Sequence, residues 1–161
     1  DREMVVKHLK IIPIEVVVRN IAAGSLLKKT NLKEGQVLSK PIVEFYYKDD
    51  SLGDPLINDS HAFAMKIATD KDLKTLKQMA EKINGRLKPF FKKQGLKLVD
   101  FKLEFGKDKN GKILSGDEIT PDTCRLWDAK TNKKLDKDRF RFDLGGVNEA
   151  YEEVSQRILG K

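Results

Sequence analysis

Apolar and polar residues alternate along Leu96–Phe105, the pattern of a β-strand with two different faces. The alternation places Leu98, Asp100, Lys102 and Glu104 on one face and Val99, Phe101, Leu103 and Phe105 on the other. Asn110-Gly111 follows, and this dipeptide favours a two-residue hairpin turn because both positions tolerate positive φ. We therefore expect a β-hairpin over residues 96–119, in which Glu104 lies directly opposite Asp117.

Two β-rich runs stand nearer the start of the chain, at Met4–Leu9 and Glu15–Ile21. They meet at Pro13, which has no N–H to donate in the middle of a sheet, so two separate short strands are expected. Pro41 opens a further strand pattern over Ile42–Lys48. Together with the hairpin, these runs predict a sheet with several strands.

Helical periodicity is clearest in Asp70–Gln94, where apolar residues recur three and four positions apart after a capping Thr69 or Asp70. Pro89 lies inside this run, so a kink or break is expected near Arg86–Lys88. Shorter helices are expected at Leu26–Thr30 with Ser25 as N-cap, at Asn58–Ala68 and at Leu144–Leu159.

The order of these elements predicts an α+β domain, with helices flanking a central, largely antiparallel sheet. The chain has no G-x-G-x-x-G sequence and no Walker-type loop, which argues against a Rossmann or P-loop nucleotide site. A length of 161 residues is enough for one medium domain with its own core.

Composition narrows the classes of partner and compartment. The net charge is +7, but the lysines are dispersed and form no tract interleaved with aromatic residues, so small phosphorylated ligands are expected and nucleic acid is not. No apolar run approaches the roughly 18–20 residues of a membrane span. The single cysteine, Cys124, rules out an internal disulfide and a zinc site built on several thiolates, and favours a cytoplasmic protein.

The expected hairpin brings two carboxylates together. Like charges that face each other across a ladder destabilise it, so Glu104 opposite Asp117 is more easily explained if a cation lies between them. With Lys102 on the same face, this arrangement suits a divalent metal and a polyphosphate. The alternative is an exposed acidic face balanced by Lys102 and Lys112.

Three basic positions are candidates for anion binding. Arg125 lies between Cys124 and Leu126-Trp127, and its guanidinium fork matches carboxylate or phosphate oxygens. Arg19 and Ser25 flank a glycine bend, and are either an anion site or a surface arginine beside a capping serine. The basic run Lys137–Arg141 is either a strand edge or a second phosphate contact. A cysteine nucleophile has little support, because neither histidine is close to Cys124 in the sequence.

Several blocks of sequence together resemble the SAICAR synthetase family: VVVRNIAAGSL (16–26), PIVEFYYKDDSLGDPLIN (41–58), LVDFKLEFG (98–106), DEITPDTCRLWD (117–128) and LDKDRFRFDLGG (135–146). The resemblance implies an ATP-grasp-like fold and an ATP- and Mg²⁺-dependent ligase of de novo purine biosynthesis. Such a ligase joins L-aspartate to the carboxylate of carboxyaminoimidazole ribonucleotide (CAIR) through an acyl phosphate, giving SAICAR, ADP and phosphate. The alternatives are another ATP-dependent enzyme, such as a small-molecule kinase, and a non-catalytic binding module.

The resemblance also implies roles for individual residues. ATP contacts are implied at Met4, Lys7, Lys102 and Glu104, and Mg²⁺ ligands at Glu104 and Asp117. Substrate contacts are implied at Arg19, Ser25, Lys48, Asp54, Asp100, Arg125, Lys137 and Arg141. Direct catalytic roles fall to Lys102, Asp117 and Arg125.

The resemblance implies a domain organisation as well. Residues 1–161 are expected to be the C-terminal ATP-grasp-like catalytic lobe, with residues 1–12 at the hinge and a small preceding N-terminal lobe missing. We expect such a fragment to be nearly inactive alone. A homodimer is one open possibility for its assembly.

Overall fold

The computed structural model describes residue 3 and residues 5–160 of the chain. It contains one six-stranded sheet with the order β3-β2-β1-β4-β5, in which β6 also pairs with β4, and each of these pairings is antiparallel. The strands are β1 (Lys10–Ile21), β2 (Val37–Tyr47), β3 (Leu56–Ile57), β4 (Leu96–Lys107), β5 (Ile113–Ser115) and β6 (Cys124–Asp128). The helices are α1 (Asp59–Ala64), α2 (Asp70–Lys93), α3 (Asp138–Arg141) and α4 (Val147–Leu159), with 3₁₀ turns η1 (Gly24–Leu26) and η2 (Asp50–Leu52).

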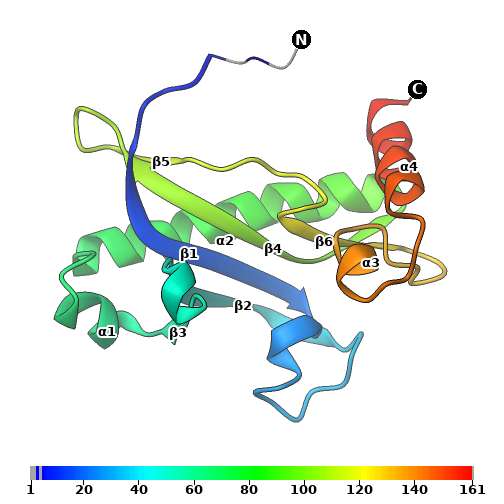
Figure 1. Cartoon of the computed structure of the whole chain (residues 1–161), viewed down its shortest axis with the longest axis horizontal. Coiled ribbons are helices and arrows are strands. Elements are labelled where there is room, and N and C mark those ends of the chain that lie inside the picture. The colour runs from blue at the N-terminus through cyan, green and yellow to red at the C-terminus, as the bar shows by residue number, and fades with distance from the viewer. Residues whose placement is uncertain (1–2, 4, 161) are drawn as a thin grey trace.

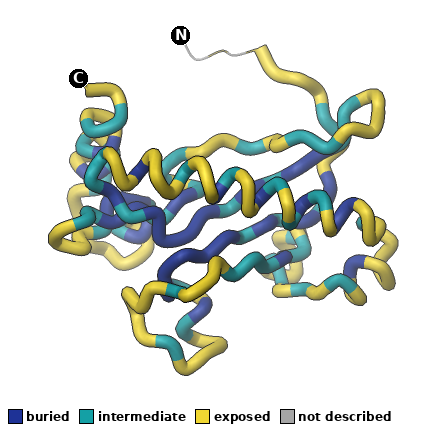
Figure 2. The backbone as a smooth tube through the Cα atoms, turned by 180° about the vertical axis from the view of Figure 1, so that it is seen from behind, coloured by how far each residue is buried: buried dark blue, intermediate teal, exposed yellow. Residues whose placement is uncertain are grey.

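The sheet has one apolar face and one polar face. In β1, Ile14, Val16 and Val18 are buried against α2, which lies behind the sheet in Figure 1. Seen from behind, α2 crosses the sheet with its outer side exposed (Figure 2). Every second residue of β1 and β4 therefore faces away from α2, toward the side on which α3 lies. The expected α+β class with a largely antiparallel sheet is confirmed.

A bulge in β4 changes which residues share a face. The pairing of β4 with β6 shifts between Leu98 and Asp100, so Leu98 joins the main core while Val99 packs in a smaller cluster with Trp127. The expected faces are therefore right from Asp100 onward and reversed for Leu98 and Val99. Periodicity alone cannot place a bulge, because the inserted residue leaves the alternation on either side intact.

The expected two-residue turn at Asn110-Gly111 is wrong. Residues 109–111 form a three-residue loop, closed by a hydrogen bond from the Asp108 N–H to the Lys112 carbonyl (3.0 Å). Only Gly111 of the loop has positive φ, at 77°. The register shifts by one residue, so Glu104 lies opposite Gly116, whose N–H donates to the Glu104 carbonyl (2.9 Å).

Pro13 does not divide the first sheet region into two strands. β1 runs continuously through it, and its register with β4 shifts between Ile11 and Glu15, where the missing N–H is tolerated. No strand covers the described part of Met4–Leu9. The short helix expected after Ser25 is only the 3₁₀ turn η1, whose N-cap is Ala23, so Ser25 is not a cap.

The longest expected helix is confirmed. α2 begins after Thr69, which forms a capping box with Asp72, and it continues through Pro89 without a break. The helices expected at 58–68 and 144–159 are present as the shorter α1 and α4. Residues 124–128 form the strand β6, for which the sequence patterns predicted no element. Lys137–Arg141 lies in and before α3 rather than on a strand edge. No described helix is long and apolar enough to cross a membrane.

Candidate active site

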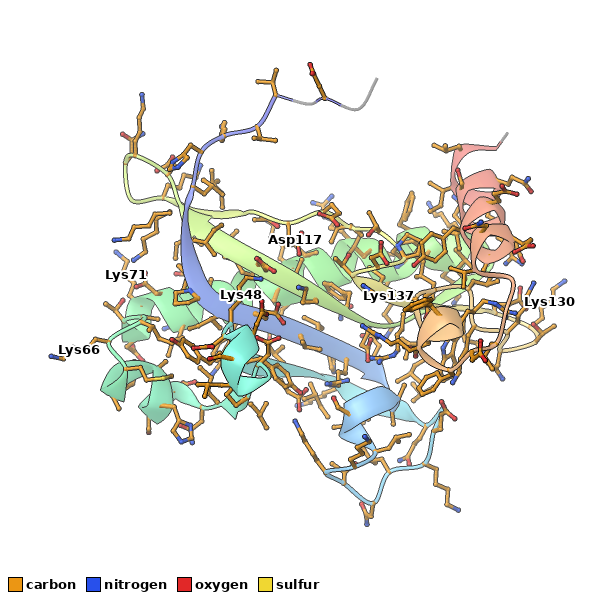
Figure 3. All side chains as sticks on the ribbon, viewed as in Figure 1. Lys48, Lys66, Lys71, Asp117, Lys130 and Lys137 are labelled. Carbon is orange, nitrogen blue, oxygen red and sulfur yellow. The ribbon has the colours of Figure 1, made fainter. Side chains whose placement is uncertain are left out.

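A cavity of about 680 Å³ lies on the polar face of the sheet, opposite α2. Its lining comes from four strands, from η1, from the loop after η2, from residues 117–123 between β5 and β6, and from residues in and before α3. In Figure 3, Lys48, Asp117 and Lys137 lie around this face, whereas Lys66, Lys71 and Lys130 lie at the periphery. The lining includes Glu15, Arg19, Ser25, Tyr46, Asp54, Asp100, Lys102, Glu104, Asp117, Glu118, Asp122, Arg125, Asp136, Lys137 and Arg141.

One part of the site, here called the lysine end, consists of Lys48, Lys102, Glu104 and Asp117. Lys102 Nζ donates to Glu104 Oε1 (3.0 Å) and to Glu15 Oε1 (2.7 Å), and Lys48 Nζ donates to Glu104 Oε1 (2.8 Å). Partial burial opposes ionisation of Glu104, but the two lysines more than offset it and lower its pKa. Glu104 is therefore ionised, and its second oxygen accepts no hydrogen bond from the described residues.

Asp117 lies beside Glu118 at the same end. Its Oδ1 accepts from the Glu118 N–H (3.0 Å). Partial burial, together with the nearby Glu118 and Glu104 carboxylates, raises the pKa of Asp117. Although the register is one residue away from the expected one, Glu104 and Asp117 are close enough to repel each other.

The carboxylates of Glu104 and Asp117 suit a hard divalent cation whose remaining coordination positions are filled by a bound ligand. Among the described residues, no three histidine, cysteine, aspartate or glutamate side chains converge as a ready metal site. Mg²⁺ in phosphate-transfer sites needs only one or two protein carboxylates, since phosphates and water supply the rest. Crowded carboxylates at Glu104 and Asp117, one with a raised pKa, match that requirement.

The other part of the site, here called the arginine end, consists of Arg19, Asp100, Arg125, Asp138 and Arg141. Arg19 on β1 is only 2% exposed. Its guanidinium donates to Glu44 (2.6 Å), Asp100 (3.0 Å), Ser25 Oγ (2.9 Å) and the Tyr46 hydroxyl (3.1 Å). These bonds fix Ser25 and Tyr46 at the cavity wall and leave Arg19 few donors for a ligand.

Arg125 on β6 is held in a different way. Its Nε donates to Asp138 (2.6 Å) and its Nη1 to Asp100 (2.9 and 3.1 Å), while Nη2 makes no hydrogen bond to a described residue. The guanidinium lies against Gly24, where φ is +56° and an added Cβ would come within 2.6 Å of Nη2. Only glycine leaves room for Arg125 in this position.

Buried Asp136 attaches α3 to the sheet. Its carboxylate accepts from the backbone N–H of Leu126 (2.7 Å) and of Asp138 (2.8 Å). Burial raises the pKa of Asp136 to about 6, despite these two bonds. The consequence is that α3, with Asp138 and Arg141, is placed next to Arg125.

The structure brings most of the expected site residues to one cavity: Arg19, Ser25, Asp54, Asp100, Lys102, Glu104, Asp117, Arg125, Lys137 and Arg141. Lys48 is outside the lining but touches the cavity through its bond to Glu104. Lys7 lies elsewhere, in a groove with Lys107 and Asn110. Met4 is outside the described residues.

Sequence reasoning missed several polar residues of the site. Glu15 pairs with Lys102. The sequence could have indicated it, because Glu15 lies two residues before Val17 and four before Arg19 and so shares one strand face with them. Glu118 also lines the cavity, and the assumed hairpin register, which was off by one residue, did not place it there. Asp136 and Asp138 were not singled out, since the groups on β6 that they bind, the Leu126 N–H and Arg125 Nε, lie ten and thirteen residues away.

Cys124 borders the cavity but is unsuited to attack a substrate. Burial raises the pKa of its thiol to about 12, so the thiolate is scarce at neutral pH. The expectation that the chemistry does not use a cysteine nucleophile is consistent with this environment.

Comparison with known proteins identifies the family. A model of the family described as SAICAR synthetase matches residues 1–158. The phosphoribosylaminoimidazole-succinocarboxamide synthase of Chloroherpeton thalassium is 66% identical over 160 residues, which cover 99% of this chain and 68% of that protein. The corresponding enzyme of Campylobacter fetus is 62% identical over 160 residues, with 99% and 68% covered.

Solved structures agree with this result. A SAICAR synthetase in complex with ADP matches with a TM-score of 0.92 and 56% identity, covering 96% of this chain and 66% of the other. The SAICAR synthase of Saccharomyces cerevisiae complexed with SAICAR matches with a TM-score of 0.75 and 28% identity, covering 96% and 62%. The chain thus spans about two thirds of the length of its relatives. The chain belongs to the SAICAR synthetase family, a family of ligases with an ATP-grasp-like fold.

Proposed function

We propose that this chain carries the ligase chemistry of its family: ATP-dependent formation of an amide between L-aspartate and the carboxylate of CAIR, giving SAICAR, ADP and phosphate. The observation that carries the proposal is the single cavity that joins the lysine end to the arginine end. A relative was solved with ADP and another with SAICAR, so a nucleotide and the product both bind within this family.

The two ends suit different parts of the reaction. At the lysine end, Lys102 and Lys48 supply positive charge beside crowded carboxylates, which suits a polyphosphate. At the arginine end, Arg125 Nη2, Ser25 and Lys137 offer donors that suit a ribonucleotide phosphate and the carboxylates of the substrates. We assign ATP to the first end and CAIR to the second.

The proposed chemistry has two steps. The CAIR carboxylate attacks the γ-phosphate of ATP, forming an acyl phosphate as ADP leaves. The amine of aspartate then attacks the acyl carbon, loses a proton and displaces phosphate. Lys102 offsets charge on the transferred group, and Arg125 holds the carboxylate in line, so positioning and electrostatics supply the rate enhancement without an enzyme nucleophile.

Glu104 and Asp117 are the residues that we propose to hold Mg²⁺. When bound there, the ion supplies charge neutralisation on the phosphates of ATP. Because a metal ion competes with the proton on Asp117, whose pKa is raised, Mg²⁺ should bind more tightly as the pH rises.

We extend the proposal to the rest of the protein. Residues 1–12 are proposed to form the hinge to a further lobe, which is supported by the irregular backbone and exposed apolar side chains of Val5 and Val6. A cytoplasmic location and a homodimer belong to the same proposal. Analytical ultracentrifugation of the full-length protein tests the homodimer directly.

The central test is a product assay with the full-length protein. SAICAR should form only when ATP, Mg²⁺, CAIR and aspartate are all present, with one ADP released per SAICAR. ADP release that does not depend on aspartate would instead support a small-molecule kinase and overturn the ligase assignment.

A further inference from the structure

We infer that Asp138 is a positioning residue for the substrate end of the site, acting through Arg125 and Arg141 without touching the ligand. This inference rests on the proposed function, since it takes Arg125 to be a contact of CAIR. It concerns a carboxylate that sequence periodicity did not single out.

Asp138 divides its two oxygens between two arginines. Oδ2 accepts from Arg125 Nε (2.6 Å), and Oδ1 accepts from Arg141 Nη1 (3.0 Å). The Asp138 side chain is only 3% exposed, and the residue is absent from the cavity lining. Both oxygens therefore bind protein partners, and the buried carboxylate does not face the cavity.

The effect on Arg125 is specific. Asp138 holds Nε and Asp100 holds Nη1, so two carboxylates fix two nitrogens of one planar group. The remaining nitrogen, Nη2, then has a fixed direction and keeps its donors for a ligand. Without Asp138, the guanidinium can rotate about its bond to Asp100, and Nη2 loses that direction.

The charge state of Asp138 supports the same role. Burial opposes its ionisation, but the hydrogen bond and the charge of Arg125, with a smaller contribution from Arg141, hold the pKa of Asp138 below its usual range. Asp136 fixes the backbone of Asp138 through its N–H (2.8 Å). The carboxylate is thus ionised and rigidly placed at neutral pH.

The test compares Asp138→Asn with Glu153→Gln in the full-length protein. Glu153 is a matched control, because it also bridges two cations, Lys133 and Arg157, but lies away from the cavity. Asp138→Asn should raise the KM for CAIR about tenfold and change the KM for ATP less than about twofold. Glu153→Gln should leave both values unchanged. An unchanged KM for CAIR in Asp138→Asn, or an equal rise in both KM values, overturns the inference.

A double-mutant cycle shows whether Asp138 acts through Arg125. In an Arg125→Ala background, adding Asp138→Asn should raise the KM for CAIR less than about twofold, because the group that it positions is gone. The same tenfold rise in that background overturns the inference. If Asp138→Asn fails to fold, Asp138→Glu takes its place, since it keeps the charge but moves the carboxylate and should still raise the KM for CAIR.

Wild-type turnover separates this inference from the proposed function. A wild-type protein that forms no SAICAR overturns the function. An active wild type whose Asp138 variants bind CAIR normally overturns only the positioning role.

Discussion

The two ends of the cavity differ in how their charges are held. At the lysine end, Lys48 is 40% exposed and Lys102 is 32% exposed in its side chain, and both bind the same glutamate oxygen. At the arginine end, the side chains of Arg19, Asp100 and Asp138 are at most 5% exposed and form a continuous network through Arg125. One end can rearrange around a ligand, whereas the other is already fixed.

The difference follows from the chemistry of the two cations. A lysine has a flexible stem and a point charge, so it can follow a phosphate that is transferred and released. An arginine has a planar fork, and buried carboxylates can fix its orientation before the substrate arrives. Under the proposed assignment, the transferred phosphoryl group would meet flexible lysines, and the ribonucleotide would meet an arginine of fixed orientation.

The largest effect is expected from Asp117→Asn. Loss of this carboxylate should reduce ADP release by about 10³-fold at saturating Mg²⁺, since charge on the transferred phosphoryl group is no longer neutralised, while the melting temperature stays close to that of the wild type. Steady-state ADP assays and calorimetry measure the two. Glu81→Gln serves as the control, because Glu81 is an exposed residue of α2, the helix on the opposite side of the sheet from the cavity. Near-normal turnover would contradict the metal assignment.

Arg19→Ala should disrupt the network of ion pairs and hydrogen bonds at the arginine end. Glu44 and Asp100 lose a buried partner, so the free energy of unfolding should fall by about 3 kcal/mol, as for other broken buried pairs. Urea unfolding measures this change. Calorimetric titration should show that CAIR binding weakens more than ATP binding, because Ser25 and Tyr46 are released as well. Equal weakening of both ligands would argue against separate ends.

Asp136→Asn tests the attachment of α3 through pH. The pKa of Asp136 is about 6 in the folded protein and lower when unfolded, so the folded state binds the proton more tightly. The stabilisation that comes from protonated Asp136 is present at pH 4 and is lost as the pH rises through 6. The stability advantage of the wild type over the variant should therefore shrink between pH 4 and 7, by on the order of 3 kcal/mol. An advantage that grows over this range contradicts the prediction. Urea unfolding of both proteins at each pH provides the measurement.

Lys48→Ala should have the smallest effect on folding. Lys48 is partly exposed, and pairs of this kind contribute about 0–1 kcal/mol. Its removal should raise the KM for ATP more than that for CAIR. A loss of stability comparable to that of Arg19→Ala would show that the two ends do not differ as described.

The local sequence was sufficient to predict elements that depend on residues close together in the chain. Thr69 and Asp72 lie three residues apart and cap α2, and the alternation in β4 correctly grouped Asp100, Lys102 and Glu104. The predicted hairpin register was wrong, and the cause is also local. Asp108 Oδ1 accepts from the N–H groups of Asn110 and Lys112, which stabilises a longer loop than the Asn-Gly pair favours.

The arginine network lay beyond any local pattern. Arg19 and Asp100 are 81 residues apart and become neighbours only through the pairing of β1 with β4. The resemblance to a family named Arg19, Asp100 and Arg125 as substrate contacts. It did not reveal that they hold one another, or that Asp138 takes part, because a motif records identities and not contacts.

At Gly24, the shape of the cavity can be changed without adding or removing a charged group. A methyl group at this position would add no charge and remove no hydrogen-bonding group, yet it would overlap a guanidinium that two carboxylates hold in place. Arg125 could yield only by giving up one of those carboxylates. Gly24→Ala would also strain the backbone, because φ at this position is +56°, and it would show how far the affinity for substrate depends on where the Arg125 guanidinium lies.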